Sequence, residues 1–440
     1  MASRVTPISG FQEWLPTQRI VEQHFLDTIR EVFELHGFAS VNTRALEPVE
    51  RLSDQGEDAD KEIYGVRRLA GDDGSTPALG LHFDLTVPFA RYVLENGGKL
   101  TFPFRRYQIQ PAWRGERPQR GRYREFIQAD IDIVEADTLP GHYEVELPLV
   151  IADAFSRLPI GPYKIQVNNR KICEGFYLGL GIEDVAGTLR TVDKLDKIGA
   201  DGVRKVLLAA GLSEEQAGRC LDLAGIATPD SSFVEQVRAL GVEHPLLDEG
   251  LAQLAAVMDA GNEHAPGVLS AELKIARGLD YYTGTVYETV IEGHEDFGSI
   301  CSGGRYDALA SDGKRTYPGV GISIGVSRLL GLLISEGGLT ASRETPAAVL
   351  VAVTDEESRS DSMRVAAALR ARGIATLVAP KAARFGKQIQ FADRRGIPFV
   401  WFPAEDGDEV KDIRSGEQVA ADRDTWSPPE ADLRPTLVLP

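Results

Sequence analysis

The chain has 440 residues and a formal net charge of -18, with 43% hydrophobic and 26% charged residues. This length predicts two or three domains, and the composition is that of an ordinary soluble globular protein. No apolar run is long enough to span a bilayer and no signal-peptide pattern is present, so we expect no membrane association. Three isolated cysteines favour a reducing cytoplasm, and the acidic balance disfavours nonspecific coating of nucleic acid.

Helices and strands are expected before the first strongly charged segment. Apolar residues recur at helical spacing from Thr17 to Gly37, which predicts a packing helix. Ser40 to Leu46 and Leu79 to Asp84 have strand patterns, and Pro88 to Glu95 has a helical pattern.

The next segment is basic although the whole chain is acidic. Positions 105–124 hold seven arginines against one acid, Glu116. Strand patterns lie on both sides of the loop from Gly115 to Arg122, so the segment predicts a β-hairpin. Because guanidinium groups bind phosphate through two parallel hydrogen bonds, the hairpin is a candidate anion site.

The second strand of this hairpin has two unlike faces. Residues 127, 129, 131 and 133 are apolar, whereas the opposite face carries Gln128, Asp130 and Asp132. Two acids and an amide beside an arginine cluster could hold a zwitterion that is joined to a phosphate. A solvated edge hairpin is the alternative for such a charge run taken alone.

From about Asp184 to Ala265 the pattern changes to short helices, which indicates a helical insertion. Most of these helices are expected to end at a glycine, namely Gly199, Gly211, Gly225, Gly241 and Gly261. Strand patterns resume from Leu273 to Ile291, and Gly319 to Leu333 predicts a strand entering a buried helix. Residues 336–344 are interpreted as a linker.

The last part of the chain alternates apolar runs with helical stretches. The runs cover 347–353, 375–379 and 398–402, and the helical stretches cover 358–372 and 385–395. This alternation predicts a βαβαβ domain with a parallel sheet. Its second helix is basic, which suits either a ligand-facing surface or a solvated face.

Several common catalytic motifs are excluded. The chain has no Walker sequence, no HExxH and no cluster of cysteines and histidines, so we expect no protein-bound metal. The glycines at 319, 321 and 325 lack the spacing of a dinucleotide fingerprint and are interpreted as sites of close backbone packing. Residues 321–325 match GxSxG, but the last histidine, His294, precedes Ser323. A hydrolase triad therefore fails on chain order, and Ser323 is interpreted as a packing residue.

The stretch from Arg277 to Glu288 supplies an arginine, two adjacent tyrosines and two glycines at the entry to a strand. Taken alone, an aromatic core turn explains it at least as well as a site does. Together with the arginine hairpin and with Gly303 to Asp307, it resembles one family, the histidyl-tRNA synthetases of class II. Residues 113–126 resemble motif 2 of all class II enzymes, and residues 277–288 resemble the more specific histidine segment.

This resemblance covers nearly the whole chain and implies its architecture. The implied fold class is α+β, with a catalytic core built on a mostly antiparallel sheet, a helical insertion and a C-terminal α/β domain. The implied boundaries are 1–183 and 266–336 for the catalytic domain, 184–265 for the insertion and 346–440 for an anticodon-binding domain.

The resemblance also implies roles for single residues. Arg114 and Arg277 match two catalytic arginines at the ATP α-phosphate, where Arg277 would stabilise the charge that develops during attack. The residues implied for histidine are Asp84, Thr86 and Gln128 at the ammonium, Asp132 and Tyr282 at the imidazole nitrogens, and Tyr281. Those implied for ATP are Arg114, Glu116, Arg117, Arg122 and Arg328, and those implied for tRNA are Gln119, Arg120, Lys387 and Arg394.

The implied reaction is ligation of L-histidine to tRNA(His) through a histidyl-adenylate, with ATP as substrate and Mg²⁺ accompanying it. A homodimer in the cytoplasm is expected. The alternative is a noncatalytic regulatory subunit of histidine biosynthesis, which shares the fold but typically lacks the C-terminal domain and has eroded site motifs. A tRNA-binding module without chemistry would not explain acids and tyrosines suited to an amino acid.

Two positions depart from the family pattern. Arg44 stands where motif 1 usually has proline, which bears on the dimer interface. Ser327 precedes Arg328 where an acid is common, which bears on one polar contact at the ATP site.

Overall fold

A computed structural model describes residues 5–53, 62–70, 77–275 and 281–439. The chain divides into two compact units by its internal contacts. One unit comprises residues 1–12 and 25–331, and the other comprises residues 13–24 and 332–440. Among the helices of the described ranges, none is both long enough and apolar enough to cross a membrane.

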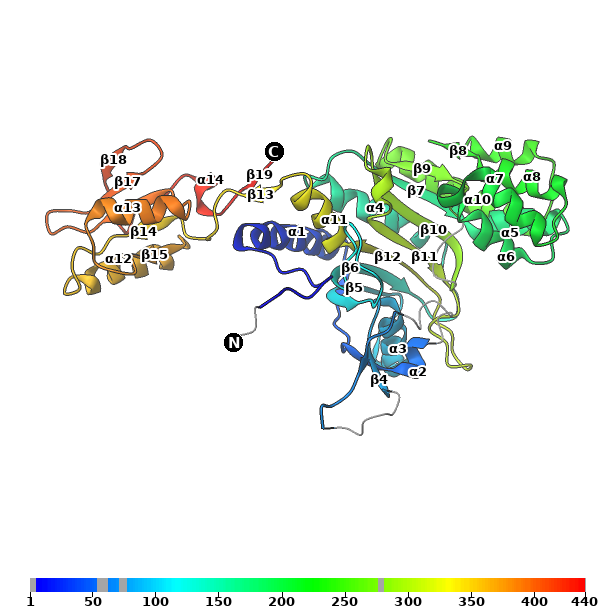
Figure 1. Ribbon diagram of the computed structural model, residues 1–440, viewed down its shortest axis with the longest axis horizontal. Helices are drawn as coiled ribbons and strands as arrows, with labels where there is room; N and C mark the ends of the chain where they lie inside the picture. The colour runs from blue at the N-terminus through cyan, green and yellow to red at the C-terminus, as the bar shows by residue number, and fades with distance from the viewer. Residues whose placement is uncertain (1–4, 54–61, 71–76, 276–280, 440) are drawn as a thin grey trace. The chain divides into compact units, whose positions relative to one another are not determined.

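The first unit is built on a nine-stranded sheet (Figure 1) whose strand order is β1-β5-β6-β12-β11-β10-β7-β9-β8. Neighbouring strands are antiparallel except where β1 meets β5 and β7 meets β9, so the expected mostly antiparallel sheet is confirmed. The strands are β1 (Ala39–Ser40), β5 (Phe104–Trp113), β6 (Glu125–Val134), β7 (Tyr163–Asn169), β8 (Ala227–Thr228), β9 (Leu269–Glu272), β10 (Tyr282–Ile291), β11 (Cys301–Tyr306) and β12 (Gly319–Gly325).

The predicted arginine hairpin is formed by β5 and β6. On the apolar side of β6, Ala129, Ile131 and Ile133 are fully buried. Helices α4 (His142–Ser156), α5 (Arg170–Gly179) and α10 (Pro245–His264) pack against the sheet. The polar side of β6 is buried as well, since Asp130 and Asp132 each expose 2% of their surface. Burial on both sides turns the polar side into an interior site rather than a solvated edge.

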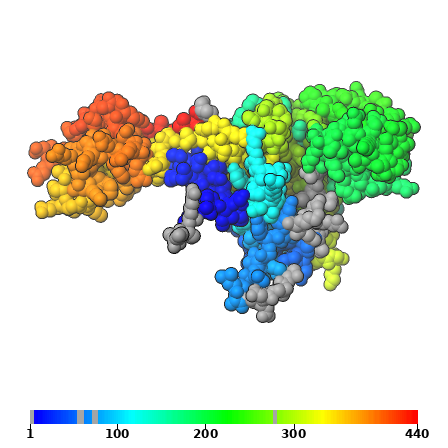
Figure 2. Space-filling view, in the orientation of Figure 1, coloured from blue at the N-terminus to red at the C-terminus, as the bar shows by residue number. Residues whose placement is uncertain are grey.

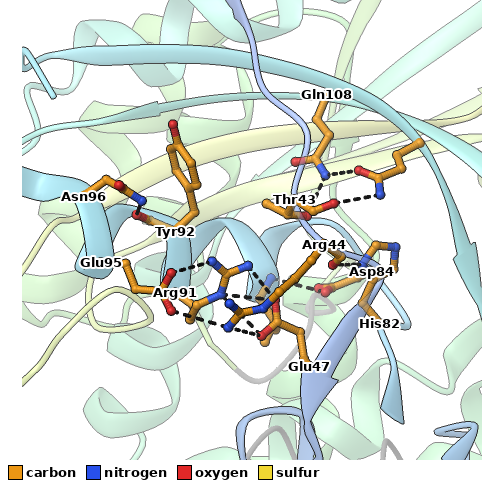
Figure 3. Close-up of polar contacts among 12 residues, drawn as sticks. Thr43, Arg44, Glu47, His82, Asp84, Arg91, Tyr92, Glu95, Asn96 and Gln108 are labelled. Atoms are coloured by element: carbon orange, nitrogen blue, oxygen red, sulfur yellow. Dashed lines mark hydrogen bonds and ion pairs between the residues drawn. The ribbon is translucent and has the colours of Figure 1, made fainter. Parts of the chain in front are cut away.

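The segments before the hairpin differ partly from the prediction. Helices α1 (Pro16–Leu35) and α3 (Thr86–Asn96) form where helices are expected, and α2 (Val49–Ser53) and the short 3-10 helix η2 (Gly97–Lys99) are added. The prediction of a continuous strand from Ser40 to Leu46 is wrong. The side chains of Gln108 and Gln110 bind Thr43 (Figure 3) in place of a strand ladder. β2 (Leu46–Pro48), β3 (Gly65–Val66) and β4 (Leu79–Leu81) form a separate small sheet.

The predicted insertion is helical and forms a lobe of its own, drawn in green in Figure 2. Its helices before α10 are α6 (Val185–Val192), α7 (Leu195–Ala209), α8 (Glu214–Ala224) and α9 (Phe233–Ala239). Gly211 and Gly241 have positive φ just beyond helix ends, as expected. Gly261 does not end a helix but lies within α10. A Cβ there would come within 2.6 Å of the Leu269 side chain, so this glycine permits close helix–strand packing.

β12 leads into α11 (Val326–Ser335), as predicted. In the second unit β15 (Thr376–Val378), β14 (Val349–Val351) and β16 (Phe399–Phe402) are parallel, between α12 (Arg359–Ala371) and α13 (Phe385–Arg394). The βαβαβ prediction is confirmed, and antiparallel β17 (Glu409–Asp412) and β18 (Gln418–Ala420) extend the sheet. The expected linker contains β13 (Thr340–Ala341), which pairs with β19 (Leu437–Val438) beyond α14 (Glu430–Leu433).

Candidate active site

The candidate site lies on the polar side of five neighbouring strands, β5, β6, β12, β11 and β10. Strand register places Arg106 on β5 opposite Asp132 on β6. Arg106 Nη2 lies 2.6 Å from Asp132 Oδ2 and 4.0 Å from Asp130 Oδ2, and all three side chains are almost fully buried. One guanidinium therefore faces two carboxylates in a region of low dielectric.

Aromatic and glycine residues complete the surroundings of Asp132. The Tyr306 hydroxyl donates a hydrogen bond of 2.8 Å to Asp132 Oδ1. Gly321 on β12 lies opposite Asp132, and a Cβ there would be only 2.1 Å from Asp132 Oδ1. At Gly304, a Cβ would come within 3.0 Å of the Tyr282 ring. The close backbone packing predicted at Gly321 is confirmed. The absence of a side chain at this position leaves room for the Asp132 carboxylate.

These strands border a small pocket. Three residues assigned to histidine, Thr86, Asp132 and Tyr282, line it together. The residues lining it without an assigned role are Asp130, Ser302, Tyr306, Gly321, Ile322 and Ser323. Ser323, interpreted as a packing residue, also lines this pocket, and its hydroxyl accepts a hydrogen bond of 2.6 Å from Gln128 Nε2.

Several buried acceptor atoms in this cluster lack a hydrogen-bond partner among the described residues. They are Asp84 Oδ2, Gln128 Oε1 and Asp130 Oδ1. The other oxygen of Asp84 accepts from the backbone N–H of Val87 at 3.2 Å, in the first turn of α3. A buried polar atom without a partner costs free energy, so the site is complementary to a ligand that supplies hydrogen-bond donors.

Burial also changes the acidity of the carboxyl groups. It raises the pKa of Asp84 and of Asp132 to about 7 and the pKa of Asp130 to about 6. The neighbouring carboxylates add to the rise at Asp84 and Asp132, whereas the Arg106 guanidinium opposes it at all three pKa values. A cationic ligand would relieve this repulsion.

The arginines of the hairpin have different surroundings. Arg105 binds Glu146 and Arg106 binds Asp132, so these two are paired within the protein. Arg114 Nε donates to the Phe83 carbonyl at 3.0 Å, and its guanidinium lies over the Phe126 ring. These contacts hold Arg114 close enough to Asp84 for its charge to lower the pKa of that carboxyl.

The loop of the hairpin carries the remaining assigned residues. Arg122 Nη1 lies 3.5 Å from Glu116 Oε2, and Arg120 lies 3.2 Å from Asp296. Arg117 and Gln119 are exposed. The loop thus presents polar side chains to solvent.

Arg328 is held by a segment far from it in the sequence. The short helix η3 (Glu295–Phe297) supplies the Phe297 carbonyl, which accepts from Arg328 Nη2, and the Phe297 ring, which lies 4.7 Å from the guanidinium. Burial and then Arg122 lower the pKa of Arg328 to about 10. Ser327, at a position where an acid is common, accepts from the backbone N–H of Ile127 at 2.8 Å and so keeps a polar contact with β6.

Four residues that the resemblance assigns to the site remain, namely Tyr281, Arg277, Lys387 and Arg394. Tyr281 packs edge-on against Tyr282 and Tyr306. Arg277 lies outside the described residues. Lys387 and Arg394 are exposed on α13 of the second unit.

Arg44, which departs from the motif 1 pattern, belongs to an ionic cluster that also contains Glu47, Arg91 and Glu95 (Figure 3). Glu47 Oε1 lies 2.6 Å from Arg91 Nη2, and both side chains are largely buried. Arg44 lies 3.4 Å from each of the two glutamates, so it adds positive charge at the exposed edge of this pair.

Tyr306 and Ser323 line the candidate pocket without a role assigned from the sequence, as do Asp130 and Ser302. Tyr306 lay in a recognised segment, 303–307, but no local pattern distinguishes a ligand-facing tyrosine from a core one. Ser323 faces Asp130 only because of the register of β12 with β6.

No group of three or more histidine, cysteine or carboxylate side chains that could hold a metal occurs in the described part of the chain.

Comparisons with known proteins agree with this geometry. Residues 10–329 match the histidyl-tRNA synthetase family, and residues 347–425 match the anticodon binding domain family. A histidine-tRNA ligase from Cutibacterium acnes is 58% identical over 99% of both chains. The crystal structure of a histidyl-tRNA synthetase from a Nostoc species superposes with a TM-score of 0.85 at 35% identity, covering 95% of this chain and 97% of that one.

A third similar protein bears on the fold alone. It is a Bacillus halodurans structure described as an ATP phosphoribosyltransferase regulatory subunit/histidyl-tRNA synthetase, with a TM-score of 0.74 at 20% identity, covering 89% of this chain and 97% of that one. The family match over residues 10–329 and the similarity along almost the full length lead to one conclusion: this chain belongs to the histidyl-tRNA synthetase family.

Proposed function

We propose that this chain joins L-histidine to tRNA(His) in two steps. Histidine and ATP form histidyl-adenylate and pyrophosphate, and a hydroxyl of the terminal ribose of the tRNA then attacks the activated carbonyl. The observation that carries the proposal is the set of buried acceptors without partners on Asp84, Gln128 and Asp130, next to an arginine hairpin. An amino acid with an ammonium and an N–H-bearing side chain supplies the missing donors, and the arginines suit the phosphates.

In this proposal the pocket holds the amino acid. Asp84, Thr86 and Gln128 bind the ammonium, while Asp132 and Tyr282 bind the imidazole nitrogens, with Tyr281 packed behind them. Support comes from the shared pocket of Thr86, Asp132 and Tyr282. A side chain without those nitrogens could not hydrogen-bond Asp132 and Tyr282, and sites built to hydrogen-bond a substrate group reject analogues that lack it.

The arginines hold ATP. Arg114 contacts the α-phosphate from one side and Arg277 from the other, and both stabilise the negative charge that develops during attack of the histidine carboxylate. Arg328 lies near the γ-phosphate, and Glu116, Arg117 and Arg122 complete the ATP site. Mg²⁺ arrives with ATP and is held mainly by phosphate oxygens and water.

The tRNA meets two basic regions. Gln119 and Arg120 contact the end of the acceptor stem, while Lys387 and Arg394 belong to the anticodon-binding domain. The catalytic domain comprises residues 1–183 and 266–336, the helical insertion 184–265 and the anticodon-binding domain 346–440. The active species is a cytoplasmic homodimer.

Amino-acid-dependent exchange of pyrophosphate into ATP tests the proposal. We expect the purified chain to exchange with histidine and with none of the other amino acids. Exchange with a different amino acid would contradict the assigned specificity. No exchange in a protein that still binds histidine would contradict the proposed chemistry and favour a noncatalytic regulatory role.

A further inference from the structure

Strand β10 pairs irregularly with β11 at the pocket. Farther along the strand, Val286 lies opposite Gly304 in antiparallel register. At the entry to β10, Tyr282 lies opposite Tyr306, so the three residues 283–285 stand against one residue of β11. Two extra residues therefore form a bulge in β10, a feature that changes which side chain reaches a given position.

The bulge decides which side chain enters the pocket. If pairing stayed regular beyond Gly304, residue 284 would lie opposite Tyr306, and that residue is a glycine. With the bulge, Tyr282 takes this position and lines the pocket beside Tyr306. A strand without the bulge would thus present no side chain where the structure presents a tyrosine.

A buried carboxylate holds the inner end of the bulge. Glu144 on α4 exposes 2% of its surface, and its Oε2 accepts from the backbone N–H of Thr285 at 3.1 Å. Its other oxygen, Oε1, accepts from Arg305 Nη1 at 2.8 Å. At Gly284, a Cβ would lie 2.8 Å from the Arg305 side chain and 3.2 Å from Glu144 Oε2. The glycine therefore lets both charged groups approach the bulged backbone.

The outer end of the bulge is held through the same arginine. Arg305 Nε donates to Asp307 Oδ1 at 3.0 Å, and the Thr283 hydroxyl donates to Asp307 Oδ2. Glu144, Arg305 and Asp307 thus form an ionic clamp that contacts the first and the last residue of the bulge. The clamp lies behind the pocket, since its three side chains are not among the described residues that line it.

We propose that this ionic clamp positions the Tyr282 hydroxyl for recognition of the substrate side chain. Its three members are then positioning residues that act through Tyr282. A fixed position matters because a hydrogen bond weakens steeply when its geometry departs from the optimum. This inference rests on the proposed function, which places Tyr282 at an imidazole nitrogen of histidine.

Glu144→Gln tests the clamp at its buried end. An amide has one oxygen where the carboxylate has two, so either the Thr285 N–H or Arg305 loses its acceptor on this side chain. In pyrophosphate exchange we expect KM for histidine to rise by ~10-fold, as for loss of one hydrogen bond, with KM for ATP unchanged. A role in folding alone would lower the amount of active enzyme and leave both KM values as they are. An unchanged KM for histidine in folded Glu144→Gln would overturn the proposal.

Glu146→Gln is the matched control. Glu146 also lies on α4 and pairs through both carboxylate oxygens with an arginine of the sheet, Arg105. That arginine belongs to β5 rather than to the bulge. Both KM values should stay at the wild-type level. A matching rise in KM for histidine would show that loss of any ion pair on α4 disturbs the pocket, and the specific role of Glu144 would fall.

A double-mutant cycle separates an effect through Tyr282 from an independent one. If the clamp acts by placing the Tyr282 hydroxyl, removing that hydroxyl should matter little once the clamp is broken. Tyr282→Phe should raise KM for histidine by less than ~3-fold in the Glu144→Gln background, against ~10-fold in wild type. Effects that multiply to ~100-fold would demonstrate independent roles and reject the proposal.

A pair of variants at Thr283 tests the outer end of the clamp and decides the matter if Glu144→Gln does not fold. Thr283→Val keeps the shape of the side chain but removes the hydroxyl that donates to Asp307, whereas Thr283→Ser retains a hydroxyl. KM for histidine should rise by ~3- to 10-fold in Thr283→Val and stay at the wild-type level in Thr283→Ser. Equal KM values in these two variants would contradict the proposal.

The wild-type protein separates the two possible failures. If it shows no exchange with histidine, the proposed function fails and this inference fails with it. If it exchanges with histidine and the clamp variants keep its KM, the proposed function stands and only the inference is rejected.

Discussion

Arg106 and Asp132 face each other across β5 and β6 with 2.6 Å between Nη2 and Oδ2, and neither side chain exposes more than 2% of its surface. The same guanidinium donates to Gln108 Oε1 and to the Leu85 carbonyl. It therefore connects the sheet, the residue before α3 and Asp132, which lines the pocket. Removing it would leave buried carboxylates without their nearest counter-ion.

Arg106→Met should destabilise the ligand-free protein by ~3–5 kcal/mol, the usual result of removing one partner of a buried ion pair. Unfolding in urea measures this loss. Adding Asp132→Asn to the same chain should recover much of the stability, because the uncompensated charge is removed. An Arg106→Met variant as stable as wild type would show that Arg106 does not neutralise the cluster.

The stability of the ligand-free protein should depend on pH through the buried aspartates. Burial raises the folded-state pKa of Asp84 to about 7, above the ordinary value of 3.8, so the folded protein binds more protons than the unfolded chain between these values. The buried carboxyl is neutral at low pH and ionises as pH rises toward 7. The free energy of unfolding therefore falls over this pH range.

Asp84→Asn removes this loss and keeps Oδ1 for the Val87 N–H. Its free energy of unfolding should exceed that of wild type by more at pH 8 than at pH 5, as measured by urea unfolding at both values. Asp222→Asn, at an exposed aspartate on α8, serves as the control. A difference that does not change with pH would contradict the raised pKa.

Tyr282→Phe should weaken recognition of histidine while leaving the fold intact, because it removes one hydroxyl from the pocket. We expect KM for histidine to rise by ~10-fold, in line with one buried hydrogen bond, and preference over other amino acids to fall. Steady-state pyrophosphate exchange measures both. Tyr143→Phe, on α4, is the control. An unchanged preference would exclude Tyr282 from the imidazole site.

Phe297→Leu should affect ATP rather than histidine. The ring lies 4.7 Å from the Arg328 guanidinium, and leucine keeps the bulk and the backbone carbonyl but not the aromatic face. Loss of a cation–π contact should raise KM for ATP by ~3- to 10-fold and leave KM for histidine unchanged.

Phe391→Leu is a matched control for this variant, because it removes the ring beneath Arg395 in the second unit. It should leave both KM values of pyrophosphate exchange at the wild-type level. Equal KM values for ATP in Phe297→Leu and wild type would show that Phe297 does not position Arg328.

Much of the architecture follows from local sequence patterns. Alternation along β6 predicted that Gln128, Asp130 and Asp132 share one side, because successive side chains of a strand point to opposite faces. Alternating apolar runs and helical stretches predicted the βαβαβ unit, since each element has its own period. The errors occurred where tertiary contacts override local pattern. Thr43 binds glutamine side chains instead of a strand, and Gly261 permits packing inside a helix.

The sequence by itself determined which chemical groups the protein has and which neighbours along one strand share a face. Only the tertiary structure decided that Asp84, Arg106, Asp132 and Tyr306, from separate parts of the chain, meet in one buried cluster. The reason is that strand register between β5, β6, β12 and β11 depends on packing across the whole sheet, which no local period encodes. Burial then gives this cluster its unpaired acceptors and raised pKa values.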